Sequence, residues 1–298
     1  MEAFRLPAQT HIGPVHLRVS DLRQSLDFYT DLLGFQEIRR QASTAFLSAT
    51  GSRPYHILLT EHRGARPKPS HTTGLNHVAI RLPNRRELAR LLKHLQTHDW
   101  PIHDLRHHNV SDALYLDDPD HNGLELCVDT PEDQWIWRGS ELALGNDPLD
   151  ADNLLGEVAE DMAPWSGIHP ETDIGHVHLY VSDLAQAEDF YCDVLGFDVM
   201  KRAPQVLFIA AGGYHHHLAV NVSRSEGQPP SPPDAVGLVS LSVCLPDDAA
   251  YQDLRQRIQT HGIASEEDNS LNGSVGTLIL DPDRNGVKIL VEPRVRRQ

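Results

Sequence analysis

The sequence predicts an α+β protein made of four βαβββ units that form two modules. One observation behind this prediction is a long internal repeat, because residues 12–35 and 174–197 match at most positions. A second is a shorter repeat, in which residues 74–83 resemble residues 237–246. Repeats of this kind indicate a duplicated supersecondary unit rather than one irregular domain.

A third repeat completes the four units. The segment D-P-D-x-N-G occupies residues 118–123 and recurs at residues 281–286. The units therefore lie near residues 11–61, 74–129, 174–223 and 237–293. We expect a first domain over residues 1–130, an acidic linker over 131–173 and a second domain over 174–298.

The third unit shows the predicted order of elements. Apolar and polar residues alternate over residues 176–181, which predicts a strand. Ser182 and Asp183 can cap a helix that begins at Leu184 and ends near Gly196. Short strands separated by turn residues follow. One helix per unit can cover one face of a sheet, which leaves the other face available for a cleft.

Residues 130–173 connect the two halves. This segment is acidic and rich in Pro, Gly and Asp, and it contains a predicted short helix over residues 150–161. Loops of this length are uncommon inside compact domains. We therefore expect the connector to carry the chain across the molecule.

The composition is that of a globular protein, with 40% hydrophobic and 23% charged residues. The net charge of −16 argues against nucleic-acid and anionic-membrane partners, because both need a basic surface. The apolar runs are too short to span a bilayer, and the N-terminus has no signal-peptide pattern. Three cysteines without C-x-x-C spacing argue against a disulfide framework. We expect a cytoplasmic protein, and its oligomeric state stays open.

Strand alternation places the candidate functional residues opposite the apolar face of each strand. In the strand near residues 77–82, Val78 and Ile80 are apolar, so His77 points the other way. The same reasoning assigns six more residues to this polar face: Tyr115, Glu125, His176, His178, His215 and His217. Such agreement is improbable for histidines scattered at random among the 19 of the chain.

Three residues of this polar face form a candidate metal site. His77, Glu125 and His176 supply two imidazoles and one carboxylate, the ligand set of non-haem Fe(II) oxygenases. Units one and four have lost this set, with Pro14 in place of His176, Ser240 in place of His77 and Lys288 in place of Glu125. A cationic lysine is unfavourable beside a divalent metal.

These replacements favour a cleft built by units two and three. The alternative is a cleft between units one and two, in which His16 takes the place of His176. His16 shares the polar face of its strand but lies two residues further along than the position that matches His176.

The motifs H-V-H-L-x-V-S-D-L, F-Y-x-D-x-L-G-F and D-P-D-x-N-G-x-E resemble those of the vicinal oxygen chelate superfamily. This superfamily includes glyoxalase I, bleomycin-resistance proteins and extradiol dioxygenases. The chain is most similar to catechol 2,3-dioxygenase-like proteins, and the resemblance covers nearly the whole chain except the connector. It implies two glyoxalase-like modules and places metal ligands on His77, Glu125 and His176.

The resemblance implies extradiol cleavage of catechol or a substituted catechol by O₂, as part of aromatic catabolism. Fe(II) is the favoured cofactor, with Mn(II) or another divalent metal as the alternative. His217 is the expected acid–base catalyst, with His215 as a substitute, and Tyr115, His108 and His215 are expected to contact the substrate. The order departs from the usual extradiol enzymes, in which the last two units carry all the ligands.

Two other functions remain open. A glyoxalase-type isomerase or lyase usually needs a fourth protein ligand, often a carboxylate, whereas unit three offers Asn221 or His217 there and not Glu or Asp. A metal-free protein that binds an aromatic compound needs an apolar cleft, whereas the predicted cleft face is polar. A fold shared by such different functions does not decide between them.

Overall fold

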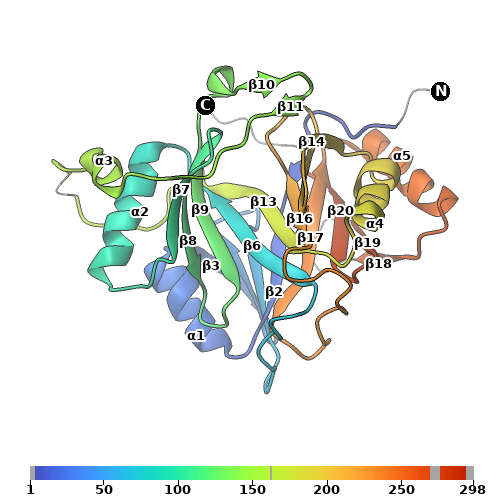
Figure 1. Ribbon diagram of the computed structural model, residues 1–298. Helices are drawn as coiled ribbons and strands as arrows, with labels where there is room; N and C mark the ends of the chain where they lie inside the picture. The colour runs from blue at the N-terminus through green and yellow to red at the C-terminus, as the bar shows by residue number, and fades with distance from the viewer. Residues whose placement is uncertain (1–3, 162, 269–275, 293–298) are drawn as a thin grey trace.

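The computed structural model describes residues 4–161, 163–268 and 276–292, and it contains two nine-stranded sheets. Figure 1 shows the strands in the middle of the molecule, with α1 and α2 on one side and α4 and α5 on the other. The predicted α+β class with four βαβββ units is confirmed. Residues 269–275 and 293–298, which belong to the predicted second domain, lie outside the described residues.

The first half of the chain contains two of these units. The first unit consists of β2 (Val15–Val19), α1 (Leu22–Leu26) with the π-helical turn η1 (Asp27–Leu32), β3 (Gln36–Gln41), β4 (Thr44–Ser48) and β5 (Ile57–Glu61). The second consists of β6 (Gly74–Arg81), α2 (Arg85–Thr97), β7 (Asp104–His107), β8 (Ser111–Asp117) and β9 (Gly123–Asp129). The short strand β1 (His11–Ile12) precedes both units.

The second half repeats this order. The third unit consists of β13 (Asp173–Tyr180), α4 (Leu184–Glu188) with the π-helical turn η3 (Asp189–Val194), β14 (Asp198–Ala203), β15 (Val206–Ala210) and β16 (Leu218–Asn221). The fourth consists of β17 (Gly237–Leu245), α5 (Asp248–Thr260), β18 (Ser265–Asp268), β19 (Gly276–Leu280) and β20 (Gly286–Val291). The Asp183 side chain caps α4 as predicted, because it accepts hydrogen bonds from the N–H groups of Ala185 and Gln186.

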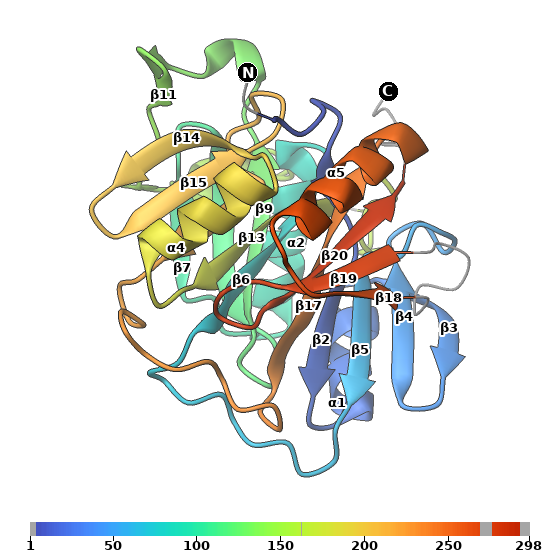
Figure 2. The same cartoon turned by 90° about the vertical axis from the view of Figure 1, so that its right-hand side faces the viewer.

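Each sheet combines one unit from each half of the chain. β6 of unit two pairs with β13 of unit three, and β2 of unit one pairs with β17 of unit four. Figure 2 shows β17, β2 and β5 side by side in the second of these sheets. The alternative cleft between units one and two is therefore wrong. His16 lies in the other sheet, where its Nε2 is 2.7 Å from Thr60 Oγ1.

The connector contains more structure than a plain loop. It includes η2 (Glu132–Gln134), the hairpin β10 (Trp137–Arg138) and β11 (Glu141–Leu142), β12 (Asp147–Pro148), and α3 (Ala151–Gly156). The helix expected over residues 150–161 is shorter, and Asp150 caps its first turn. β12 pairs with β7, so the connector extends the sheet formed by units two and three.

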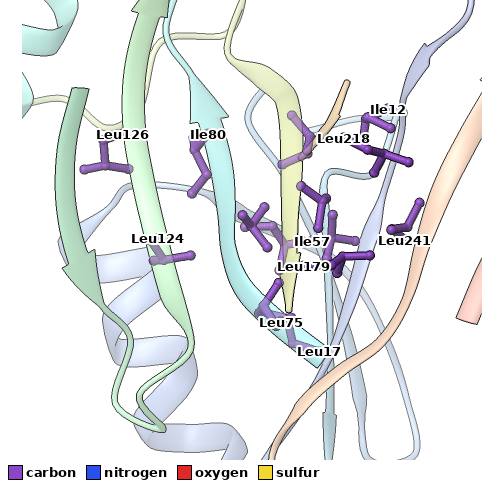
Figure 3. Close-up of a cluster of buried hydrophobic side chains, with 14 of the residues drawn as sticks. Ile12, Leu17, Ile57, Leu75, Ile80, Leu124, Leu126, Leu179, Leu218 and Leu241 are labelled. Atoms are coloured by element: carbon purple, nitrogen blue, oxygen red, sulfur yellow. The ribbon is translucent and has the colours of Figure 1, made fainter. Parts of the chain in front are cut away.

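One continuous apolar core holds the two sheets together. Figure 3 shows side chains of both sheets in this core, among them Leu17, Leu75, Leu179 and Leu241. They come from β2, β6, β13 and β17, the four strands that form the two junctions between units. Burial of apolar side chains stabilises the arrangement by about 25 cal/mol per Å² removed from water. Within the described residues, no helix is long and apolar enough to cross a membrane.

The two D-P-D-x-N-G turns provide polar links between the sheets. Asp118 accepts hydrogen bonds from the N–H groups of Asp120 and Asn122, and its Oδ2 also accepts the Tyr29 hydroxyl proton at 3.0 Å. Tyr29 belongs to unit one and Asp118 to unit two, so this bond links two units whose strands lie in different sheets. In the second half Tyr191 donates to Asp281 in the same way, at 2.8 Å.

Gly123 closes the first of these turns where no side chain fits. A Cβ atom at this position would lie 2.2 Å from the carbonyl oxygen of Asn76 on β6. Gly286 is equally confined, since its Cβ would lie 2.4 Å from the carbonyl oxygen of Val239 on β17. The repeated glycine therefore permits close approach between neighbouring strands.

The Tyr29 hydroxyl should stabilise the fold measurably. Burial raises the pKa of Asp118 to about 6, so the carboxylate is ionised at pH 8. We expect Tyr29→Phe to lower the free energy of unfolding by about 1.5–3 kcal/mol, as for other hydrogen bonds to charged groups. Urea unfolding at pH 8 measures this change. Tyr191→Phe is the matched variant, and the effects should add because the two sites share no partner. Losses below about 0.5 kcal/mol in both variants would contradict the proposed link.

Candidate active site

A pocket of about 420 Å³ lies over the junction between β6 and β13. It is formed by units two and three together with the connector, so it draws on both halves of the chain. Its wall contains most of the residues that strand alternation assigns to the polar face. The lining residues are Asn76, His77, His108, Val110, Tyr115, Glu125, Leu144, Gly145, Asn146, His176, His178, Phe208 and His216.

Sheet register brings the three candidate ligands together. Ala79 on β6 pairs with Glu125 on β9 at one side and with His176 on β13 at the other. His77 lies two residues before Ala79 and therefore shares its face of the sheet. Ala79 is fully buried, and its methyl group is small enough to leave space between the three longer side chains.

The donor atoms of these side chains converge. One atom from each of His77, Glu125 and His176 lies within 4.8 Å of the other two, which makes them the one such group found among the described residues. The Nε2 atoms of His77 and His176 are 3.0 Å and 3.2 Å from the same carboxylate oxygen, Oε2 of Glu125. All three side chains are buried.

The surroundings of His77 leave its Nε2 free to bind a metal. Its Nδ1 lies 3.1 Å from Oδ1 of Asn76, an acceptor, so the ring proton is on Nδ1. Nε2 is buried and makes no hydrogen bond within the described part of the chain, although Glu125 is close. Metal-binding histidines show the same arrangement, in which the other ring nitrogen donates to an oxygen. The residues present therefore fit a divalent metal.

The charges of this group also suit a metal. Burial favours a neutral Glu125, but the neighbouring His176 and His77 hold the pKa of this carboxyl well below its usual range. Burial lowers the pKa of His176, which favours the neutral imidazole. A carboxylate with two neutral imidazoles is a suitable donor set for Fe(II) with open coordination positions.

Tyr115 and His108 lie in the pocket and contact each other. Nδ1 of His108 is 3.0 Å from the carbonyl oxygen of Gly145, so the ring proton is on Nδ1. Its Nε2 then accepts the Tyr115 hydroxyl proton over 2.9 Å. Burial and the nearby Glu125 raise the pKa of Tyr115 above its usual value, which keeps the phenol neutral.

His217 does not lie where strand alternation predicts. β16 begins only at Leu218, so the alternating pattern does not extend into the preceding loop. The ring of His217 is buried against Tyr214, and its Nδ1 accepts the N–H of Ala211. Among the described residues of this loop, His216 lines the pocket instead. Its ring centroid is 4.0 Å from that of His176.

His215 lies behind His216 rather than in the pocket wall. Its Nδ1 is 2.8 Å from Nδ1 of His216, and its Nε2 is 3.0 Å from Oδ1 of Asp129. His215 is expected to contact the substrate, but the described lining of the pocket includes His216 and not His215.

Several lining residues have no clear signal in the sequence. Val110, Leu144 and Phe208 form an apolar part of the wall, and Leu144 comes from the connector. His178 has a polar-face assignment but no predicted role. The Nδ2 amide of Asn221 lies 2.7 Å from its Nε2, which identifies this nitrogen as an acceptor.

The other sheet has the same register without the ligands. Ser240 pairs with Gly286 as His77 pairs with Gly123, and Leu278 pairs with Lys288 as Tyr115 pairs with Glu125. Nζ of Lys288 forms an ion pair with Asp268 at 2.7 Å. An ammonium group thus occupies the position of the carboxylate in the candidate site.

Comparison with known proteins supports the fold and the family. The model of the glyoxalase/bleomycin resistance protein/dioxygenase superfamily matches residues 10–126 and 173–289. A catechol-2,3-dioxygenase from Bacillus subtilis (strain 168) is 38% identical over 262 residues, which covers 87% of this chain and 90% of the relative.

Two solved structures share the fold at low sequence identity. A putative dioxygenase from Bacillus subtilis matches with a TM-score of 0.71 and 13% identity, covering 98% of this chain and 87% of the other. Glyoxalase I from Zea mays matches with a TM-score of 0.57 and 16% identity, covering 95% of this chain and 92% of the other. The match to the family model over most of the chain and the identity with the curated relative show that this chain belongs to the glyoxalase/bleomycin resistance protein/dioxygenase superfamily.

Proposed function

We propose that the protein is a metal-dependent extradiol dioxygenase that opens the ring of catechol or a substituted catechol. The chain is a catechol 2,3-dioxygenase-like oxidoreductase. The proposal adds the reaction, the metal and the residues that take part. The observation that carries it is the convergence of His77, Glu125 and His176 at the wall of a pocket large enough for an aromatic ring.

The two histidines and the glutamate would hold Fe(II), with Mn(II) as the alternative. When bound, the metal supplies Lewis-acid and redox chemistry for joining O₂ to a catechol. The protein keeps the donor atoms buried and fixes the His77 ring through Asn76. A glyoxalase-type site usually has a carboxylate as its fourth ligand, and the described pocket lining contains no carboxylate besides Glu125.

The remaining lining residues suit an aromatic diol. Tyr115 and His108 present a hydroxyl and an imidazole that can reorient toward a substrate oxygen. The His216 ring lies against that of His176, and His215 contacts its Nδ1, which leaves Nε2 for the substrate. We assign to this nitrogen the acid–base role that a ring-cleaving enzyme needs, and thus replace His217 by its neighbour.

The apolar side of the pocket points to an uncharged ring substituent. Val110, Leu144 and Phe208 can contact the ring, and the described lining contains no lysine or arginine that would pair with a carboxylate. Burial of an unpaired charge is costly, so carboxylated catechols should bind less well. We propose catechol and its alkyl-substituted forms as substrates, within aromatic catabolism.

Anaerobic loading with Fe(II), followed by catechol and air, tests the reaction. We expect O₂ consumption and a yellow ring-opened product, with a lower KM for catechol and methylcatechol than for a carboxylated catechol. The Fe(II) content is measured on the same sample. Full occupancy without turnover of any catechol in the panel would disprove the proposal.

Metal analysis tests the ligand assignment. We expect His176→Ala to lose the bound Fe(II), because it removes one of three ligands. His16→Ala is the matched control, since His16 occupies the polar face of the other sheet. The expected result is an Fe(II) to protein ratio near zero for the first variant and unchanged for the second. Loss of metal in the His16 variant alone would contradict the assignment.

Paired variants test the assignment of His216. We expect His216→Asn to lower kcat by about 10²–10⁴-fold, the usual contribution of an acid–base group, with the Fe(II) content kept. His217→Asn is the matched control, because an amide oxygen can still accept the N–H of Ala211. Its kcat should stay within about tenfold of the wild type. The opposite order of effects would assign the role to His217.

A further inference from the structure

A series of hydrogen-bonded polar side chains leads from the sheet to His216. Asp129 is the last residue of β9 and lies on the same face of that strand as Glu125. Its Oδ2 accepts from Nη1 of Arg81 at 2.8 Å, and its Oδ1 lies 3.0 Å from Nε2 of His215. His215 in turn contacts His216 through the two Nδ1 atoms, 2.8 Å apart.

The ionised carboxylate of Asp129 can only accept hydrogen bonds from its neighbours. Burial opposes its ionisation, but Arg81 and His215 hold the pKa of its carboxyl well below the usual range. The Tyr214 hydroxyl also donates to it, at 3.0 Å. Arg81 is fixed from its other side, because Nε and Nη2 both donate to the carboxylate of Asp173 at 2.9 and 2.8 Å.

Because the Asp129 carboxylate is an acceptor, the donor and the acceptor can be assigned in each hydrogen bond between Asp129 and His216. Because the carboxylate accepts, Nε2 of His215 must carry a proton. A neutral imidazole with its proton on Nε2 has a lone pair on Nδ1, so in this form Nδ1 of His215 accepts. Nδ1 of His216 must then donate, which leaves Nε2 of His216 without a proton. Burial lowers the pKa of His216, in agreement with a neutral ring.

We propose that Asp129 and His215 are positioning residues that fix His216 in the tautomer with its proton on Nδ1. An unprotonated Nε2 can accept the proton of a catechol hydroxyl, so that the O–H bond breaks as the N–H bond forms. The consequence for catalysis rests on the proposed function. The tautomer itself does not, because it follows from hydrogen bonds within the protein.

Asp129 fixes the tautomer of His216 indirectly, through the second histidine His215. Asp129 contacts His215 and is not among the described residues that line the pocket. Its side chain instead reaches a second hollow of about 820 Å³, which is lined by residues of β9, α2 and the connector. Asp129 therefore acts through His215 and has no expected contact with the substrate.

Nitrogen-15 NMR of the full-length chain, freed of paramagnetic metal by chelation, tests the tautomer directly. The signals of His216 are identified by their loss in His216→Gln. We expect coupling patterns that place the proton of His216 on Nδ1 in the wild type. A proton on Nε2 of His216 in the wild type overturns the proposal without any further variant, whether or not the protein turns over catechol.

The variant Asp129→Asn should reverse the donor and acceptor roles in the hydrogen bonds between residue 129, His215 and His216. An amide at this position offers its oxygen to Arg81 and its NH₂ group to His215, so Nε2 of His215 becomes the acceptor. His216 should then carry its proton on Nε2. Asp173→Asn is the matched control, since it also weakens the pairing of Arg81, whereas Asp129 is the carboxylate bonded to Nε2 of His215. If Asp129→Asn does not fold, His215→Phe breaks the same relay and should abolish the preference for Nδ1.

Steady-state kinetics connects the tautomer to turnover. We expect kcat of Asp129→Asn to fall by about 10–100-fold, as for other residues that orient a functional histidine, with a smaller change in KM. The kcat of Asp173→Asn should stay within about threefold of the wild type, as expected for a residue outside the relay. Equal losses in both variants with an unchanged tautomer would show a merely structural role for Asp129. An inactive wild type with the expected tautomer would disprove the proposed reaction but not the positioning.

Discussion

The electrostatics of one buried carboxylate govern the arrangement of this molecule. Glu125 is 2% exposed, and a charge so far from water is tolerated only when other groups compensate for it. The compensating groups are His77 on β6, the strand next to that of Glu125, and His176 on β13, the strand beyond it. The junction of these two strands is therefore both a structural seam between the halves of the chain and the place where the candidate ligands meet.

The other sheet shows how the same register accommodates a different charge. There Lys288 takes the position of Glu125 and is neutralised by Asp268 rather than by histidines. Each sheet thus contains one buried charge at an equivalent point, with a partner matched to its sign. The duplicated scaffold keeps the strand order and the D-P-D-x-N-G turns in both copies, whereas the residues on the polar face have diverged.

Sequence reasoning was accurate where the backbone is regular and failed where it is not. His77, Glu125 and His176 lie within strands, so a period of two residues correctly assigned their face. The segment before β16 is a loop, where that period has no meaning, and its pocket-lining residue is His216 rather than His217. Leu144 and Asn146 reach the pocket from the connector, a long-range contact that no local pattern announces. The pairing of units two and three was inferred from lost ligands in the other units, not from periodicity.

The exchange of units between sheets has a consequence for the integrity of the site. Residues 1–130 contain two members of the ligand group, His77 and Glu125, whereas His176 comes from the other half. Neither half can assemble the group alone, and neither can complete either sheet. Tight metal binding would therefore require that the two halves of the polypeptide pair correctly. Folding of the two halves onto each other and assembly of the candidate metal site would be a single event.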